Sequence, residues 1–190
     1  MALKIHNTDV EILRGSVADQ EVDAIVNAAN TGMRGGGGID GVIHRKAGKG
    51  LLEELERVAP DGARTGSVVV TGGHKLPQEY VFHTPGPRWR GGKANEPALL
   101  SLCYRGCMEA ADARKLESLA FCSISTGVYG YPIAQAAPIA VRTVLNYLRD
   151  NPQTSLKRVV FAMFGDTEFD EFASALGANG SEFALKETFE

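Results

Sequence analysis

The sequence has little of several features that point to particular classes of protein. Its 190 residues include only three cysteines and no Cys-x-x-Cys pair, which argues against a disulfide scaffold and favours a reducing, cytoplasmic setting. No hydrophobic run approaches the roughly 18 residues of a membrane span, and the opening MALKIHNTD lacks the apolar stretch of a signal peptide. The formal net charge of −3 argues against strong nucleic-acid binding across a basic face.

Length and composition favour one globular domain. The chain is 44% hydrophobic and 23% charged, with no internal repeat or linker, so a full core is expected without disulfides or metals. We expect a single domain over residues 1–190 with its core at about 10–176, a tail over 180–190 that frays, and a monomer.

Strand and helix patterns alternate along the chain. Runs rich in Val, Ile and Phe predict strands at 10–13, 24–26, 67–71, 80–84, 118–123 and 158–164. Apolar periodicity predicts helices at 39–47, 51–58, 96–114, 132–149 and 167–176. The last of these is expected to start at a capping box of Thr167 and Asp170 and to stop at Gly177. This alternation indicates an α/β fold with a mixed, mostly parallel sheet between helices.

Two glycine-bearing loops follow predicted strands, at 30–38 and 125–130. Ligands of such sheets bind outside the carboxyl ends of strands. The first loop contains four consecutive glycines directly before a helix, where bare backbone N–H groups can form an anion-binding nest. Tight turns are the alternative explanation of the glycines. Two facing nests favour a diphosphate ligand.

Gly36, Gly38 and Gly41 match the dinucleotide-fold fingerprint G-x-G-x-x-G, but the context does not fit. The fingerprint needs its first glycine at the end of the strand, whereas residues 27–35 intervene here, and Asp61, at the distance expected of the ribose-binding acid, lies in a turn. A dinucleotide-dependent oxidoreductase is therefore the least favoured reading.

Four segments together resemble a known family. DAIVNAAN, GGGGIDGVIHRKAG, YVFHTPGP and SISTGVYGYP occur in this order, and the chain is similar to MacroD-type macrodomains from about Val10 to Phe164. The resemblance implies a three-layer α/β/α sandwich that binds ADP-ribose. It also implies an enzyme that hydrolyses the ester between ADP-ribose and an acidic side chain, or the acetyl ester of O-acetyl-ADP-ribose, without metal or cofactor.

Asp40 and Asn30 are the predicted catalytic residues. Asp40 stands at the start of a helix, where the dipole favours its charge, and it can orient a water. A plain N-cap aspartate is the alternative, and the match to the family's catalytic aspartate favours the functional role. The resemblance assigns Asn30 to the distal ribose, the alternative being a turn asparagine. His44, one helical turn after Asp40, is a secondary candidate that could help hold the ribose or tune the aspartate, and a satisfied structural histidine is the commoner alternative.

Further residues are predicted to bind the substrate. The diphosphate would meet N–H groups of both loops, and the Tyr129 ring would cover the distal ribose, with a core position as the alternative that the flanking glycines disfavour. Phe164 would lie against the adenine, with core packing as its alternative. The predicted substrate-binding set is Gly37, Gly38, Ile39, His44, Ser125, Thr126, Gly127, Val128, Tyr129, Ser16, Val17 and Phe164.

The sequence departs from the family at the predicted adenine site. Where the family usually carries Gly-Asp after the first strand, this chain reads RGSVADQ, with Ser16 in place of the aspartate. A hydroxyl accepts a weaker hydrogen bond than a carboxylate, so we expect weakened base discrimination unless Asp19 takes part.

Other polar residues are predicted to be structural. They are Asn27, His83, and Cys103 and Cys107 on one apolar helix face, where core packing is favoured over zinc.

Two other functions remain open: a reader that binds ADP-ribose without cleaving it, and a regulator that docks on RNA or a ribonuclease. The expected partners are ADP-ribose and ADP-ribosylated proteins or O-acetyl-ADP-ribose. The physiological target, and attack at the anomeric or the acyl carbon, stay open.

Overall fold

The computed structural model describes residues 1–187, and their side chains through residue 180. A seven-stranded sheet has the order β1-β2-β7-β6-β3-β5-β4. The strands are β1 (Ala2–Ile5), β2 (Thr8–Arg14), β3 (Ala24–Ala29), β4 (Val69–Gly72), β5 (Tyr80–Pro85), β6 (Ser118–Phe121) and β7 (Arg158–Met163). Strands β2, β7, β6, β3 and β5 are parallel, and only the edge strands β1 and β4 pair antiparallel. The predicted mixed, mostly parallel sheet is confirmed.

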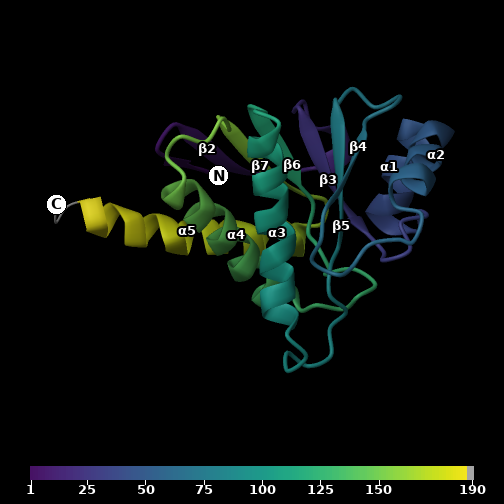
Figure 1. The fold of residues 1–190 in the computed structure, drawn as a ribbon. Helices are drawn as coiled ribbons and strands as arrows, with labels where there is room; N and C mark the ends of the chain where they lie inside the picture. Colours follow the sequence, from purple (N-terminus) through teal and green to yellow (C-terminus); the bar gives the residue numbers. More distant parts are fainter. Residues whose placement is uncertain (188–190) are drawn as a thin grey trace.

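Helices cover both faces of the sheet, as Figure 1 shows. They are α1 (Gly38–Ala47), α2 (Lys49–Val58), α3 (Glu96–Ala113), α4 (Ile133–Asp150) and α5 (Asp166–Glu187), with a short 3₁₀ turn η1 (Val17–Asp19). Tyr104 of α3 and Phe172 of α5 pack on Phe161 of β7, and Phe161 stacks on Phe121 of β6. Register places Asn27 of β3 on the opposite face, the one that faces α1. The three-layer sandwich is therefore confirmed.

The C-terminal helix differs from its prediction in two ways. It begins at Asp166, and its cap is Gly165, whose N–H donates to Glu168 at 3.4 Å, so the expected pair of Thr167 and Asp170 is wrong. It also continues through Gly177. Gly177 keeps a helical backbone where α5 packs on β1, and a Cβ there would lie 3.4 Å from Met1 Cε, an ordinary contact distance.

The N-terminal strand β1 is absent from the strands predicted from the sequence, because its four residues ALKI give too short an alternation. The fraying of the tail remains a prediction, and residues 188–190 lie outside the described part of the chain.

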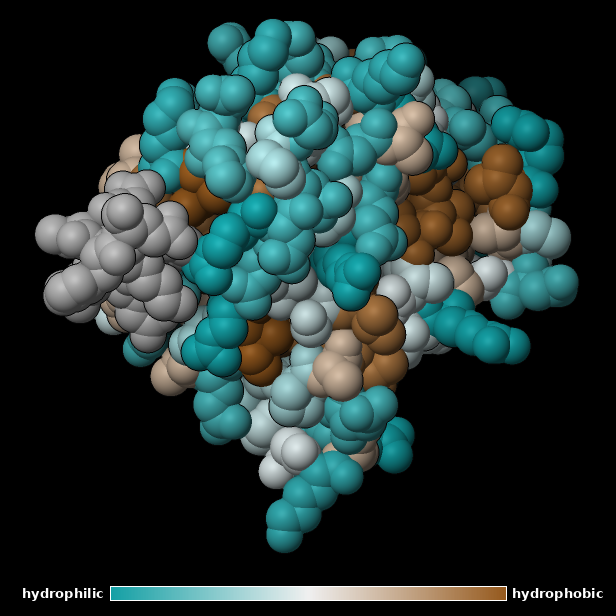
Figure 2. Space-filling view, turned by 60° about the vertical axis from the view of Figure 1, so that its left-hand side comes forward, coloured by the Kyte–Doolittle hydropathy of each residue, from teal (hydrophilic) through white to brown (hydrophobic). Residues whose placement is uncertain are grey.

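The surface is largely hydrophilic on the face in Figure 2, with separate hydrophobic patches. A groove of about 750 Å³ between β4 and α3 is lined by both apolar side chains, among them the half-exposed Leu102, and charged ones, among them Arg105 and Glu109. Among residues 1–187, no helix has both the length and the apolar character of a membrane span.

Candidate active site

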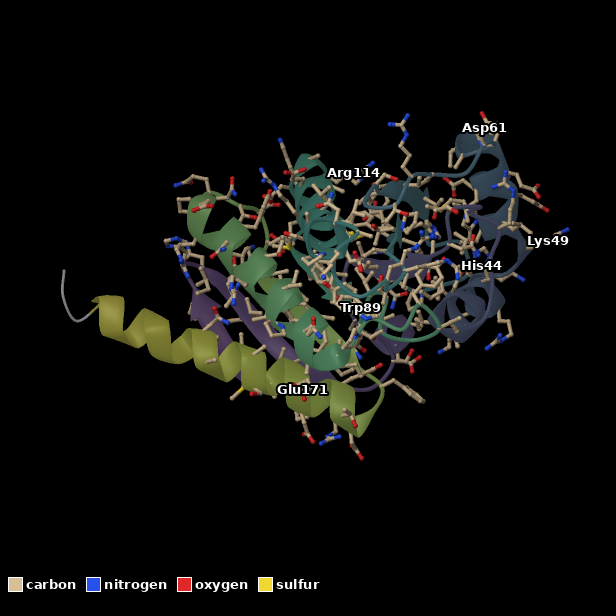
Figure 3. All side chains as sticks on the ribbon, turned by 90° about the horizontal axis from the view of Figure 1, so that it is seen from below. His44, Lys49, Asp61, Trp89, Arg114 and Glu171 are labelled. Carbon is tan, nitrogen blue, oxygen red and sulfur yellow. The ribbon has the colours of Figure 1, made fainter. Side chains whose placement is uncertain are left out.

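The predicted site residues lie on segments that follow the parallel strands. Ser16 and Val17 follow β2, the glycine loop follows β3, Ser125 to Tyr129 follow β6, and Phe164 follows β7. Parallel strands present their carboxyl ends at one edge of a sheet. The topology therefore brings these segments to a single edge of the sheet. Figure 3 looks at the molecule from below, with His44 and Trp89 among its labelled side chains.

The glycine loop contains two kinds of glycine. A Cβ at Gly36 would meet Asp40 Oδ2 at 3.3 Å and Asn30 Nδ2 at 3.4 Å, so this position lies close against the predicted catalytic side chains. A Cβ at Gly37 or Gly38 would meet no atom within 4 Å, and Gly38 has a positive φ of 57°. A side chain at Gly36 would thus press on the Asp40 and Asn30 side chains, while Gly37 and Gly38 leave backbone open to a ligand.

Gly41, in the first turn of α1, supports the loop from below. A Cβ there would lie 2.6 Å from the Gly36 carbonyl oxygen, a backbone atom that cannot move alone. We expect Gly41→Ala to lower the free energy of unfolding by about 1–3 kcal/mol through overpacking and to weaken ADP-ribose binding about tenfold, measured by urea unfolding and calorimetry.

The matched control is Gly177→Ala, also in a helix, where the nearest atom would lie at an ordinary 3.4 Å. Helix propensity alone should make that variant up to about 1 kcal/mol more stable. Equal effects of the two substitutions would contradict the role given to Gly41.

Asn30 braces the glycine loop. Its Nδ2 donates to the Gly35 carbonyl at 2.9 Å, and its Oδ1 accepts from the Met33 N–H at 3.1 Å. The turn role considered from the sequence is therefore present. The contact with the distal ribose stays a prediction, for which Nδ2 retains one further hydrogen.

Asp40 is only 5% exposed and lies in the first turn of α1. Its Oδ1 accepts from Asn27 Nδ2 at 2.8 Å and lies 3.3 Å from His44 Nε2, which is not aligned for a hydrogen bond. Its Oδ2 is the oxygen that faces Gly36. The role of a plain helix N-cap is excluded, because the N-cap is Gly37 and makes no side-chain cap bond.

Asn27 and His83, both fully buried, extend the site below Asp40. Asn27 Nδ2 lies 3.1 Å from His83 Nδ1, and His83 Nε2 lies 2.9 Å from Thr71 Oγ1. Burial lowers the pKa of His83 from 6.5 to about 3; nearby Asp40 raises that pKa and His44 lowers it. The imidazole is therefore neutral near pH 7.

The second loop combines backbone strain with an unpartnered hydroxyl. Ser125 has a positive φ of 68° and is buried, and its Oγ has no hydrogen-bond partner among the described residues. A Cβ at Gly86 would lie 2.1 Å from this Oγ, so the loop after β5 supports Ser125 directly. Strain and unsatisfied polar groups of this kind concentrate at functional sites.

The rest of the second loop is exposed at its tip. Val128 is 96% exposed, Gly127 has open space around its Cα, and Ser123 and Thr126 share a hydroxyl hydrogen bond of 2.6 Å. The guanidinium of Arg88 lies 4.3 Å from the centre of the Tyr129 ring. That cation–π contact joins Tyr129 to the loop after β5.

The predicted adenine side has unexpected contacts. Ser16 Oγ accepts from the Ala18 N–H at 3.3 Å and so caps η1, while Val17 is buried. Asp19 forms an ion pair with Lys46 of α1. Phe164 is 86% exposed, so its alternative role in core packing is wrong, and contact with a base stays a prediction.

The cysteines lie in the core. Burial raises the pKa of Cys103 to about 11 and of Cys122 to about 12, so neither thiol is an activated nucleophile. In residues 1–187 as described, His, Cys, Asp and Glu form no group of three or more that could hold a metal ion.

The fold is that of an α/β domain, with a mostly parallel sheet between helices. Its candidate site, made of glycine loops and a buried carboxylate, lies outside the carboxyl ends of the strands, where ligands of this class bind. The Macro domain family model matches residues 26–140. The chain therefore belongs to the Macro domain family, and the resemblance to MacroD-type macrodomains is confirmed.

Individual relatives agree with this assignment. Macro domain-containing protein CT2219 of Chlorobaculum tepidum is 44% identical over 172 residues, 90% of this chain and 98% of that protein. A Salmonella typhimurium protein named O-acetyl-ADP-ribose deacetylase is 49% identical over 141 residues, 73% of this chain and 79% of that one. A mutant Oceanobacillus iheyensis macrodomain solved with ADPR matches with a TM-score of 0.86 and 34% identity, covering 94% of this chain and 97% of that chain.

Proposed function

We propose that this macrodomain binds ADP-ribose and hydrolyses carboxylic esters of it, acting on O-acetyl-ADP-ribose and on ADP-ribose attached to acidic side chains of proteins. The observation that carries the proposal is the Asp40 carboxylate, held through Oδ1 and facing the glycine loop through Oδ2. The name of the Salmonella relatives as O-acetyl-ADP-ribose deacetylases supports the first substrate.

The two glycine-bearing loops are proposed to hold the diphosphate. Gly37 and Gly38 begin α1, where the N-terminal end of the helix dipole favours negative charge. In the facing loop, the open Cα of Gly127 and the unpartnered Oγ of Ser125 offer room and a donor. A diphosphate in this position would bring the distal ribose toward Asp40.

In the reaction, Asp40 Oδ2 would orient a water and accept its proton. For O-acetyl-ADP-ribose, the water oxygen forms a bond to the acyl carbon and the ester C–O bond breaks; Asp40 then gives its proton to the departing ribose oxygen, and acetate and ADP-ribose leave. For the protein-linked ester, we propose attack at the anomeric carbon with the side-chain carboxylate as leaving group. Carboxylates are good leaving groups, so one positioned water and charge stabilisation suffice.

Two measurements test the proposal. Calorimetric titration with ADP-ribose should give saturable binding, and purified protein should release acetate from O-acetyl-ADP-ribose and ADP-ribose from a glutamate-linked peptide. No heat and no shift in melting temperature with ADP-ribose would remove the proposal. Release from only one substrate would assign the activity to that ester.

Ser16 leads to a prediction about the base. Because its hydroxyl already caps η1 and Asp19 is paired with Lys46, neither offers the free carboxylate that would select adenine. We expect ADP-ribose and IDP-ribose to bind within about threefold of each other, and Ser16→Asp to strengthen the preference for ADP-ribose, since a charge-assisted hydrogen bond is roughly twice as strong. Calorimetry with both ligands checks this, and a large preference in the wild type would contradict it.

A further inference from the structure

We infer that Thr71, His83 and Asn27 form a hydrogen-bonded relay that positions Asp40 for the ester hydrolysis proposed above, on which this inference rests. The relay runs from β4 through β5 and β3 to α1. Asn27 and His83 are register partners on neighbouring strands, so the sheet itself sets their separation.

Each polar hydrogen of the relay can be assigned to one acceptor. Thr71 Oγ1 donates its only hydrogen to the Gly72 carbonyl at 3.1 Å, so toward His83 it can only accept. His83 Nε2 therefore carries the proton and donates to Thr71 Oγ1 at 2.9 Å. Nδ1 is left as a lone pair and accepts from Asn27 Nδ2 at 3.1 Å. The second hydrogen of Asn27 Nδ2 goes to Asp40 Oδ1 at 2.8 Å.

The state of Asn27 supports this direction. Its Oδ1 is buried without a hydrogen-bond partner among the described residues, an arrangement that costs free energy and calls for an explanation. A flipped amide would place Oδ1 2.8 Å from the Asp40 carboxylate oxygen, a repulsive contact between two acceptors. The amide is thus held so that both of its hydrogens donate, and Asn27 fixes Oδ1 of Asp40 while leaving Oδ2 toward Gly36.

The test compares two variants of His83. His83→Phe keeps the ring without either nitrogen, while His83→Asn places an oxygen near the position of Nδ1 and can still accept from Asn27. We expect His83→Phe to lower kcat on O-acetyl-ADP-ribose about tenfold or more with the ADP-ribose Kd within about twofold. His83→Asn should recover most of the lost kcat.

A purely structural role of His83 predicts a different pattern. Both variants would then lose stability and the folded protein would keep the wild-type kcat, a result that overturns the relay. Should His83→Phe fail to fold, Thr71→Val carries the same test, because it removes the acceptor for Nε2–H and should lower kcat without changing Kd.

Nuclear magnetic resonance of the imidazole nitrogens separates this inference from the proposed function. The relay requires His83 to be protonated at Nε2 and bare at Nδ1 between pH 5 and 8, whether or not the wild type turns over. A protein without turnover but with this tautomer disproves the proposed activity and keeps the hydrogen-bonded arrangement. Protonation at Nδ1 overturns the relay in either case.

Discussion

An Asp40→Ala variant is expected to hydrolyse O-acetyl-ADP-ribose at least about 100-fold more slowly than the wild type, because general-base assistance of this kind contributes roughly 10² to 10⁴ in rate. The carboxylate is buried, oriented by Asn27 and adjacent to the glycine loop. Its proposed task, accepting a proton from water, belongs to the transition state, so ADP-ribose affinity should change by less than about threefold. Initial-rate kinetics and calorimetry on the same preparations measure both quantities.

Two further variants control the Asp40 experiment. Asp40→Asn keeps the shape of the side chain and removes its basicity, so it should lose turnover as Asp40→Ala does. Asp150→Ala removes an exposed carboxylate at the end of α4, at the opposite edge of the sheet from the site, and should keep wild-type rates. Undiminished turnover in Asp40→Ala would exclude Asp40 from the mechanism. If the wild-type protein binds ADP-ribose but hydrolyses neither ester, a reader function is favoured instead.

The parts of the site that sequence reasoning predicted are those written in contiguous residues. Four glycines followed by Ile-Asp-Gly predict a loop of bare backbone that leads into a helix with a carboxylate in its first turn. The structure agrees, since α1 starts at Gly38. The strand and helix alternation likewise indicated a parallel sheet, because each connection is local. The candidate edge of the sheet followed from these two features.

The support beneath Asp40 could not be predicted in the same way, since it depends on pairing between strands distant in the chain. Asn27 and His83 are 56 residues apart and meet only because β3 and β5 are neighbours in register. A buried histidine between apolar residues is typical of a satisfied core side chain, and the sequence carries no sign that its partner is an asparagine aimed at Asp40. The sequence predicts a structural role for His83, whereas its contact with Asn27 follows from the pairing of β3 with β5.

The buried histidine also makes the protein sensitive to acid. In the unfolded chain His83 takes up a proton near its ordinary pKa of 6.5, whereas burial keeps it neutral in the fold until about pH 3. Between these values the unfolded state binds one more proton, so the free energy of unfolding falls by about 1.4 kcal/mol for each pH unit that is lost. At pH 4.5, two units below 6.5, His83 therefore lowers the free energy of unfolding by about 3 kcal/mol relative to neutral pH.

Urea unfolding of the wild type and of His83→Asn at a series of pH values measures this contribution. The carboxylates and other histidines titrate in both proteins, so they cancel in the difference between the two curves. We expect His83→Asn to be less stable by a constant amount above pH 7, because it loses the bond to Thr71, and its disadvantage should shrink by about 3 kcal/mol on acidification to pH 4.5. Parallel curves would mean that His83 titrates alike in the folded and unfolded chains, and a neutral imidazole would then not be what orients Asn27 toward Asp40.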